Sequence, residues 1–244
     1  EDPESEKYLF YRGIGNLHAP LRVKTDLDSN RLSLYANFEH VLLSDETSQI
    51  ECLWLADIRA DGAAAFRELE PISVTKDRSA KLNEFSAEFQ EDDYQSDGLT
   101  KLRQAMHEQL VAAGLYKDEA TAMLSTWERA YFKSPGLRLF FVVPRAWTDH
   151  YLPLKISQPA KIERVMMGRI ELITPEQRKL LAELAKSDVS NSKWIDKLQP
   201  TTLRSQLLAG RFPEDKFQQV REQMPEDYQL YMQLGRFRNA LVVA

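Results

Sequence analysis

The sequence contains a single cysteine, Cys52, among its 244 residues. One cysteine excludes an intramolecular disulfide, and it also excludes a zinc site built mainly from thiolates. The four histidines are far apart in the sequence, at His18, His40, His107 and His150. Because no metal-binding or cofactor-binding motif is found either, we predict neither a metal nor a cofactor.

The common catalytic signatures are also absent. The sequence has no G-x-S-x-G nucleophile elbow, no H-E-x-x-H zinc motif and no phosphate-binding G-x-x-x-x-G-K-[ST] loop. An active site assembled from distant residues stays possible, because a catalytic triad is defined by geometry and not by order in the chain. No apolar run approaches the roughly 20 residues that a membrane-spanning helix needs. We therefore predict no transmembrane segment in this chain.

Charge is present but unevenly distributed. Residues 1–95 carry 10 Lys and Arg against 20 Asp and Glu, whereas residues 96–244 carry 22 against 17. In one interpretation the two parts attract each other within one fold. In the other, the basic part contacts an anionic partner. The net charge is −5, and non-specific nucleic-acid binders usually carry a basic footprint, so we expect no nucleic-acid partner.

Alternating apolar and polar residues predict short strands in the first part of the chain. The predicted strands cover residues 8–11, 20–27, 31–38, 49–59, 63–69 and 84–90. Asp28-Ser29-Asn30 and Asp61-Gly62 predict hairpin turns between neighbouring strands. Cys52 shares one face of its strand with Ile50 and Trp54, which favours a core residue over a nucleophile.

The strongest patterns lie between residues 97 and 174. Residues 97–113 and 118–132 have helical spacing, with Gly114 as a natural end of the first helix. The apolar run of residues 137–143 predicts a strand buried on both faces, and residues 161–173 alternate as a half-buried strand. Gly168 in this last strand predicts a bulge or the close approach of another group. Trp127 lies on an apolar helix face, so we predict its burial against residues 137–143.

These patterns predict an α+β fold with an antiparallel, β-rich, sandwich-like core. A helical hairpin at about residues 97–132 is inserted before the last two strands. We assign residues 1–174 to this β-rich domain. Residues 175–244 form a helical segment, which we expect to pack on that domain.

The connection between the last two predicted strands is the best candidate for a functional site. It combines Arg145, Trp147, Asp149, His150 and Tyr151 in what we predict to be a loop after a buried strand. Aromatic residues and Arg are the types that anchor interfaces, and Pro144 and Pro153 stiffen both ends. In the simpler interpretation, the two rings cover the edge of the core and the arginine pairs with a carboxylate.

Four blocks of the sequence resemble a known family. They are FYRGIG near the start, GLYKDEATAML with TWERAYF, GLRLFFVVPR, and RVMMGRIELITPEQ. The family consists of uncharacterised bacterial proteins that are usually predicted to be exported, and no activity is assigned to it. The resemblance therefore implies a periplasmic or secreted location but no catalytic residues. The chain begins at Glu1 and not at Met, so we expect any signal peptide or lipid anchor to precede it.

Two classes of function are compatible with the sequence. The first is an extracytoplasmic binding or assembly module, whose partner would be a protein or another envelope component. The second is a hydrolase with a dispersed active site, in which His150 acts as a base with Asp149 or Glu128 nearby. The absence of a catalytic motif favours the first, although it leaves open whether the protein is an enzyme.

Overall fold

The computed structural model describes residues 19–26, 30–37, 48–74, 81–173, 184, 192–209, 216–226 and 228–229. It divides into two compact units, Glu1–Leu172 and Ile173–Ala244. The strand predicted at residues 8–11 lies outside the described residues, as does much of the helical segment predicted from residue 175.

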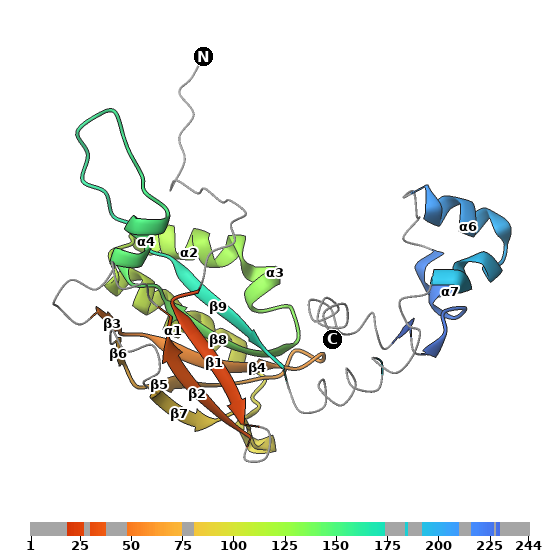
Figure 1. Ribbon diagram of the computed structural model, residues 1–244, viewed down its shortest axis with the longest axis horizontal. Helices are drawn as coiled ribbons and strands as arrows, with labels where there is room; N and C mark the ends of the chain where they lie inside the picture. Colours follow the sequence, from red (N-terminus) through yellow and green to blue (C-terminus); the bar gives the residue numbers. More distant parts are fainter. Residues whose placement is uncertain are drawn as a thin grey trace. The chain divides into compact units, whose positions relative to one another are not determined.

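The strands of the first unit form three antiparallel sheets (Figure 1). Their orders are β1-β2-β7, β3-β6 and β5-β4-β8-β9, and β4 and β8 occupy the centre of the four-stranded sheet. The strands are β1 Leu21–Asp26, β2 Arg31–Ala36, β3 Ser48–Ile50, β4 Leu53–Ile58, β5 Ala64–Leu69, β6 Ile72–Val74, β7 Lys81–Ser86, β8 Gly136–Val142 and β9 Met167–Leu172. The prediction of an antiparallel α+β fold is confirmed.

Both predicted hairpins are found. β1 pairs with β2, and Asn30 at the end of their turn has a φ of 48°, a left-handed conformation that Asn tolerates better than most residues. β4 pairs with β5 around Gly62, which has a φ of 90°. The Arg59 amide donates to the Ala63 carbonyl at 2.9 Å and closes this second turn.

Several strand boundaries differ from the prediction. The segment predicted at residues 49–59 is interrupted at residues 51–52, so that β3 and β4 belong to different sheets. Cys52 and Trp54 consequently face the helices, whereas Ile50 faces the opposite side. The strand predicted at 84–90 is β7, which begins earlier and ends at Ser86. Of the strand predicted at 161–173, only Met167–Leu172 forms a regular strand, which is β9.

The predicted helical insertion lies between β7 and β8. It follows a 3-10 turn, η2 Glu91–Asp93, and consists of α1 Gly98–Ala112, α2 Lys117–Thr126 and α3 Glu128–Tyr131. α1 ends before Gly114, whose φ of 117° suits the residue that follows a helix. The prediction of one continuous helix over residues 118–132 is wrong. Trp127 departs from helical geometry, with φ −96° and ψ 6°, and separates α2 from α3.

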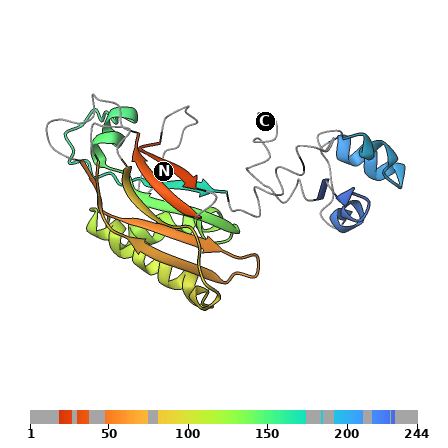
Figure 2. The ribbon, with the colours of Figure 1, turned by 60° about the horizontal axis from the view of Figure 1, so that its bottom comes forward.

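The helices cover one face of the four-stranded sheet, and the three-stranded sheet covers the other (Figure 2). One core packs Leu102, Met106 and Leu124 of the helices against Trp54 and Phe140. The other joins the two sheets through alternate residues of their strands, among them Leu32, Leu34, Leu55, Leu139 and Phe141. β8 contributes to both cores, so the predicted burial on both of its faces is confirmed.

Gly168 makes the close approach that its place in a strand predicts. A methyl group added at its Cα would lie 2.4–2.7 Å from ring atoms of Phe141, the residue opposite it on β8. We therefore expect Gly168→Ala to lower the free energy of unfolding by about 1–3 kcal/mol, the usual cost of overpacking. Urea denaturation measures this loss. In the background of Phe141→Leu, the added methyl should cost much less, and an equal cost in both backgrounds would contradict the steric explanation.

A charged cluster is buried beneath α3 on the helix side of the sheet. Arg138 of β8 is 1% exposed and lies opposite Glu171 of β9, with 3.5 Å between Arg138 Nε and Glu171 Oε2. Arg169 Nε contacts the other oxygen of Glu171 at 3.0 Å, and its guanidinium lies 5.8 Å from the centre of the Tyr131 ring. Burial raises the pKa of Glu171, and the charge of Arg138 opposes that rise.

The second unit is a small helical assembly. Its described elements are η3 Ser192–Lys197, α6 Thr201–Leu208 and α7 Phe217–Arg221. Leu198, Leu203 and Val220 are buried in its core, and Trp194 and Met224 pack against them. Helical structure within the segment predicted after residue 175 is therefore present where the chain is described.

Candidate functional site

The five predicted site residues lie on a short helix and not in a loop. Arg145–Tyr151 forms α4, which begins directly after Pro144. The Trp147 and Thr148 amides donate to the Pro144 carbonyl at 3.1 and 3.2 Å and close its first turn. Pro144 precedes the first helical residue and has an extended ψ of 136°, and a proline there has no amide that would need a partner.

The helix separates these residues into two groups. Trp147 is 3% exposed and belongs to the core between the sheets, against which the half-buried Tyr151 also packs. Their rings, one helical turn apart, lie 4.8 Å from each other. Arg145, Asp149 and His150 are exposed. The aromatic residues therefore anchor α4, and the charged residues are the ones that reach the surface.

Arg145 joins α4 to the chain that returns toward β9. Its Nε donates to Asp149 Oδ2 at 3.1 Å within the helix. Its Nη1 donates to Glu163 Oε2 at 3.1 Å, and its Nη2 donates to the Ile162 carbonyl at 2.7 Å. One guanidinium thus holds two carboxylates and one backbone oxygen, and the planar fork of arginine suits such simultaneous contacts.

Arg164 makes a second set of contacts, from the chain that returns toward β9 back to α4 and the residue that follows it. Its Nη1 donates to Asp149 Oδ1 at 3.0 Å, and its Nη2 donates to the Leu152 carbonyl at 2.5 Å. Its side chain is only 8% exposed, whereas that of Asp149 is 46% exposed. Both oxygens of Asp149 are therefore engaged. We call Arg145, Asp149, Glu163 and Arg164 the clamp.

Lys161 extends the clamp at its edge. Its Nζ lies 3.0 Å from Glu163 Oε1. The hydrogen bond and the positive charge of Lys161, followed by the charge of Arg145, lower the pKa of Glu163. Glu163 consequently stays ionised at neutral pH and keeps both of its cationic partners.

The clamp closes the base of a projecting segment, Pro153–Lys161, which we call the arm. Figure 1 shows it in green, extending away from α4 and the sheets. The whole segment is described and contains neither helix nor strand, and every residue in it except the half-buried Leu154 is exposed. Ile156 is 47% exposed near its middle. The arm is therefore held at its two ends and not by packing along its length.

The two carboxylates that the sequence predicts near His150 form ion pairs with other groups. His150 is exposed, and its ring meets that of Tyr151 edge-on at 4.8 Å. Asp149 is committed to the two arginines of the clamp. Glu128, the other carboxylate considered, lies 3.4 Å from Lys133. In the part of the chain that the structure describes, His150 thus has no carboxylate partner that would orient it as a base.

Among the described residues, neither Cys52 nor a group of metal ligands offers an alternative site. The Cys52 thiol is half-buried and donates to Gln109 Oε1 at 3.0 Å. Burial, and secondarily the charges of Glu51 and Glu68, raise the pKa of this thiol, so it stays protonated at neutral pH. Among the described residues, no three His, Cys, Asp or Glu side chains gather as they would around a metal ion.

Glu163 and Arg164 are the site residues that the sequence patterns did not single out. They lie in a stretch that alternates like a strand, so their spacing alone does not mark them as site residues. A usable signal was nevertheless present, because charged residues flank a proline-containing segment on both sides.

Comparison with known proteins adds no family to this description: no family model, no curated protein and no solved structure matches the chain. Every described helix is too short or too polar to span a bilayer.

Proposed function

We propose that this protein is a binding module that contacts a partner through the arm, Pro153–Lys161. The observation that carries the proposal is the combination of an exposed segment with two fixed ends. Eight of its nine residues are exposed. The clamp joins the chain immediately before and after the segment, through Arg164 to the Leu152 carbonyl and through Arg145 to the Ile162 carbonyl.

The clamp fixes the position of the arm more than it stabilises the fold. Exposed ion pairs contribute only about 0–1 kcal/mol each to folding, and Arg145, Asp149 and Glu163 are all partly exposed. Their effect is to restrict where the arm begins and ends. A segment that is restricted before it binds loses less conformational entropy on binding, and Pro153 and Pro159 restrict the backbone further.

The chemistry of the arm fits a protein partner. The arm presents Ile156 between prolines, together with the ammonium group of Lys155. Proline-containing segments dock in grooves lined by aromatic side chains, and Lys155 favours a carboxylate at the rim of such a groove. We also propose an extracytoplasmic location, which the resemblance to exported proteins supports.

A photo-crosslinking experiment in producing cells tests both proposals. We expect p-benzoylphenylalanine at position 156 to yield one discrete adduct, because the side chain there projects from the arm. The same group at Glu108, an exposed position on α1, serves as the control and should yield none. After cell fractionation the adduct should lie in the envelope or periplasmic fraction. Its yield should fall when Lys155→Glu reverses the charge that the arm presents to the partner.

The possible outcomes test the binding site and the cellular location separately. An adduct at Glu108 of the same size and yield would refute the arm as the specific contact surface. An absence of adducts at Ile156 and at the neighbouring exposed position Ser157 would refute it as well. A discrete adduct in the cytosolic fraction would support the arm as the contact surface and refute the extracytoplasmic location.

A further inference from the structure

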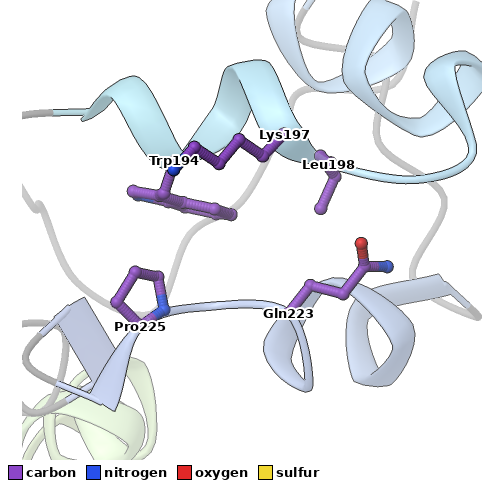
Figure 3. A pocket seen from close by; sticks show the side chains of 5 residues that line it. All are labelled: Trp194, Lys197, Leu198, Gln223 and Pro225. Atoms are coloured by element: carbon purple, nitrogen blue, oxygen red, sulfur yellow. The ribbon is translucent and has the colours of Figure 1, made fainter.

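The second unit contains a pocket with a cavity volume of about 440 Å³. Its lining residues come from two segments, as Figure 3 shows: Trp194, Lys197 and Leu198 on one side, and Gln223 and Pro225 on the other. The plane of the indole faces the Pro225 ring across the pocket. This volume lies within the range of small-molecule sites in proteins, roughly 300–1,000 Å³.

The walls of the pocket are held by contacts outside it. Leu198 is 1% exposed and belongs to the core of the unit. Gln223 Oε1 accepts from the Gln199 amide at 2.8 Å, while its Nε2 donates to the Gln199 carbonyl at 2.6 Å. This reciprocal pair ties the two sides of the pocket together. The amide of Gln223 is thereby committed to the protein backbone.

The indole of Trp194 supplies a flat apolar wall. The Tyr228 ring packs on it at 5.0 Å with an interplanar angle of 57°. Trp194 Nε1 is covered and has no hydrogen-bond acceptor among the described residues. The ring therefore contributes its face to the pocket, and the opposing Pro225 makes the space between them suitable for a planar group.

The charge at the pocket comes from Lys197. Its side chain extends along the same wall as Trp194 (Figure 3), and the residue is exposed. The neighbouring acid, Asp196, pairs instead with Arg204 at 2.5 Å. Within the described part of this unit, no carboxylate forms an ion pair with Lys197. The pocket thus combines a flat apolar space with a cation that an anionic ligand can reach.

We propose that this pocket binds an aromatic carboxylate, with the ring between Trp194 and Pro225 and the carboxylate beside the Lys197 ammonium. 2-Naphthoate is the probe, and 2-naphthamide is its uncharged counterpart of the same shape. Tryptophan side-chain N–H signals of the ¹⁵N-labelled full chain report binding. The signal of Trp194 is identified by its loss in Trp194→Phe.

We expect 2-naphthoate to shift the Trp194 signal and to leave the other three tryptophan signals in place. Lys197→Met should weaken the binding of 2-naphthoate about two- to fivefold, the range of exposed charge pairs, and should leave 2-naphthamide binding unchanged. Trp194→Leu should weaken both probes by roughly tenfold, because it removes the flat wall. Lys117→Met, which removes an exposed lysine of α2 in the first unit, is the matched control and should change neither affinity.

Two results would overturn the proposal. One is a Trp194 signal that stays unmoved at millimolar 2-naphthoate. The other is a ratio of the two probe affinities that is the same in the Lys197→Met variant as in the unmodified protein. Because the pocket and the arm share no residue, a negative result here leaves the proposed role of the arm unaffected.

Discussion

Replacing Arg138 with methionine is expected to lower the free energy of unfolding by about 3–5 kcal/mol, the cost of removing one partner from a buried charged group. Arg138 Nη1 donates to the Ala130 and Tyr131 carbonyls, both at 3.2 Å. Its Nη2 donates to the Ser134 and Pro135 carbonyls at 2.7 and 3.0 Å. Methionine fills a similar space but donates to none of these four oxygens.

The affected carbonyls explain the size of the effect. They lie at the end of α3 and in the turn before β8, where a helix leaves its last carbonyls without partners in the helix. Glu171 would also lose a cation while it stays largely buried. Urea denaturation followed by circular dichroism measures the loss. Arg31→Met, which breaks an exposed pair with Glu84, should cost at most about 1 kcal/mol. Similar costs for the two variants would contradict the assignment.

Trp147→Ala is the second substitution with a large expected effect, again about 3–5 kcal/mol, because it empties a buried aromatic site. The matched comparison is Trp127→Ala. Trp127 is only half-buried and stacks on Tyr131 with 5.9 Å between ring centres, so its removal should cost roughly half as much, since burial scales with area. Thermal denaturation of both variants measures the difference. Equal costs would contradict the prediction that the more deeply buried Trp147 contributes more to stability than Trp127.

This comparison also corrects an expectation from the sequence. Trp127 was expected to be buried against residues 137–143, but it lies at the break between α2 and α3 and stays half-exposed. A substitution of Trp147 is expected to damage the core, so a double change of Arg145 and Trp147 is a poor test of binding. Arg145→Ala alone leaves Trp147 in place and perturbs only the clamp.

The regular elements were predictable where the pattern is long and uninterrupted. Six of the seven residues of 137–143 are apolar, which favours a strand buried on both sides, and the helical spacing of 97–113 ends at a glycine. α4 was missed because a helix of seven residues between two prolines is too short for helical spacing to stand out. The interruption at residues 51–52 was missed because alternation continues through it, although the pairing partners change from β6 to β5 and β8.

The site was predictable in its residue types and not in its geometry. Arg145 and Asp149 are four residues apart, a spacing that joins side chains only on a helix. The partners Glu163 and Arg164 come from the far side of the arm. Their approach depends on where β9 begins, which is decided by pairing with β8 and by the space that Gly168 leaves for Phe141. No local pattern contains that information.

The position of β8 has a consequence for the order in which the first unit folds. Leu53 of β4 pairs with Phe141 of β8, and the helical insertion lies between them in the chain. Pairing across so long a segment slows folding, because the entropy of closing the long loop is lost before the contact can compensate for it. During synthesis, β4 and β5 emerge well before β8, so one edge of their hairpin stays open. An open apolar edge invites pairing with other chains, and a chaperone that shields β4 until β8 emerges would suppress this aggregation.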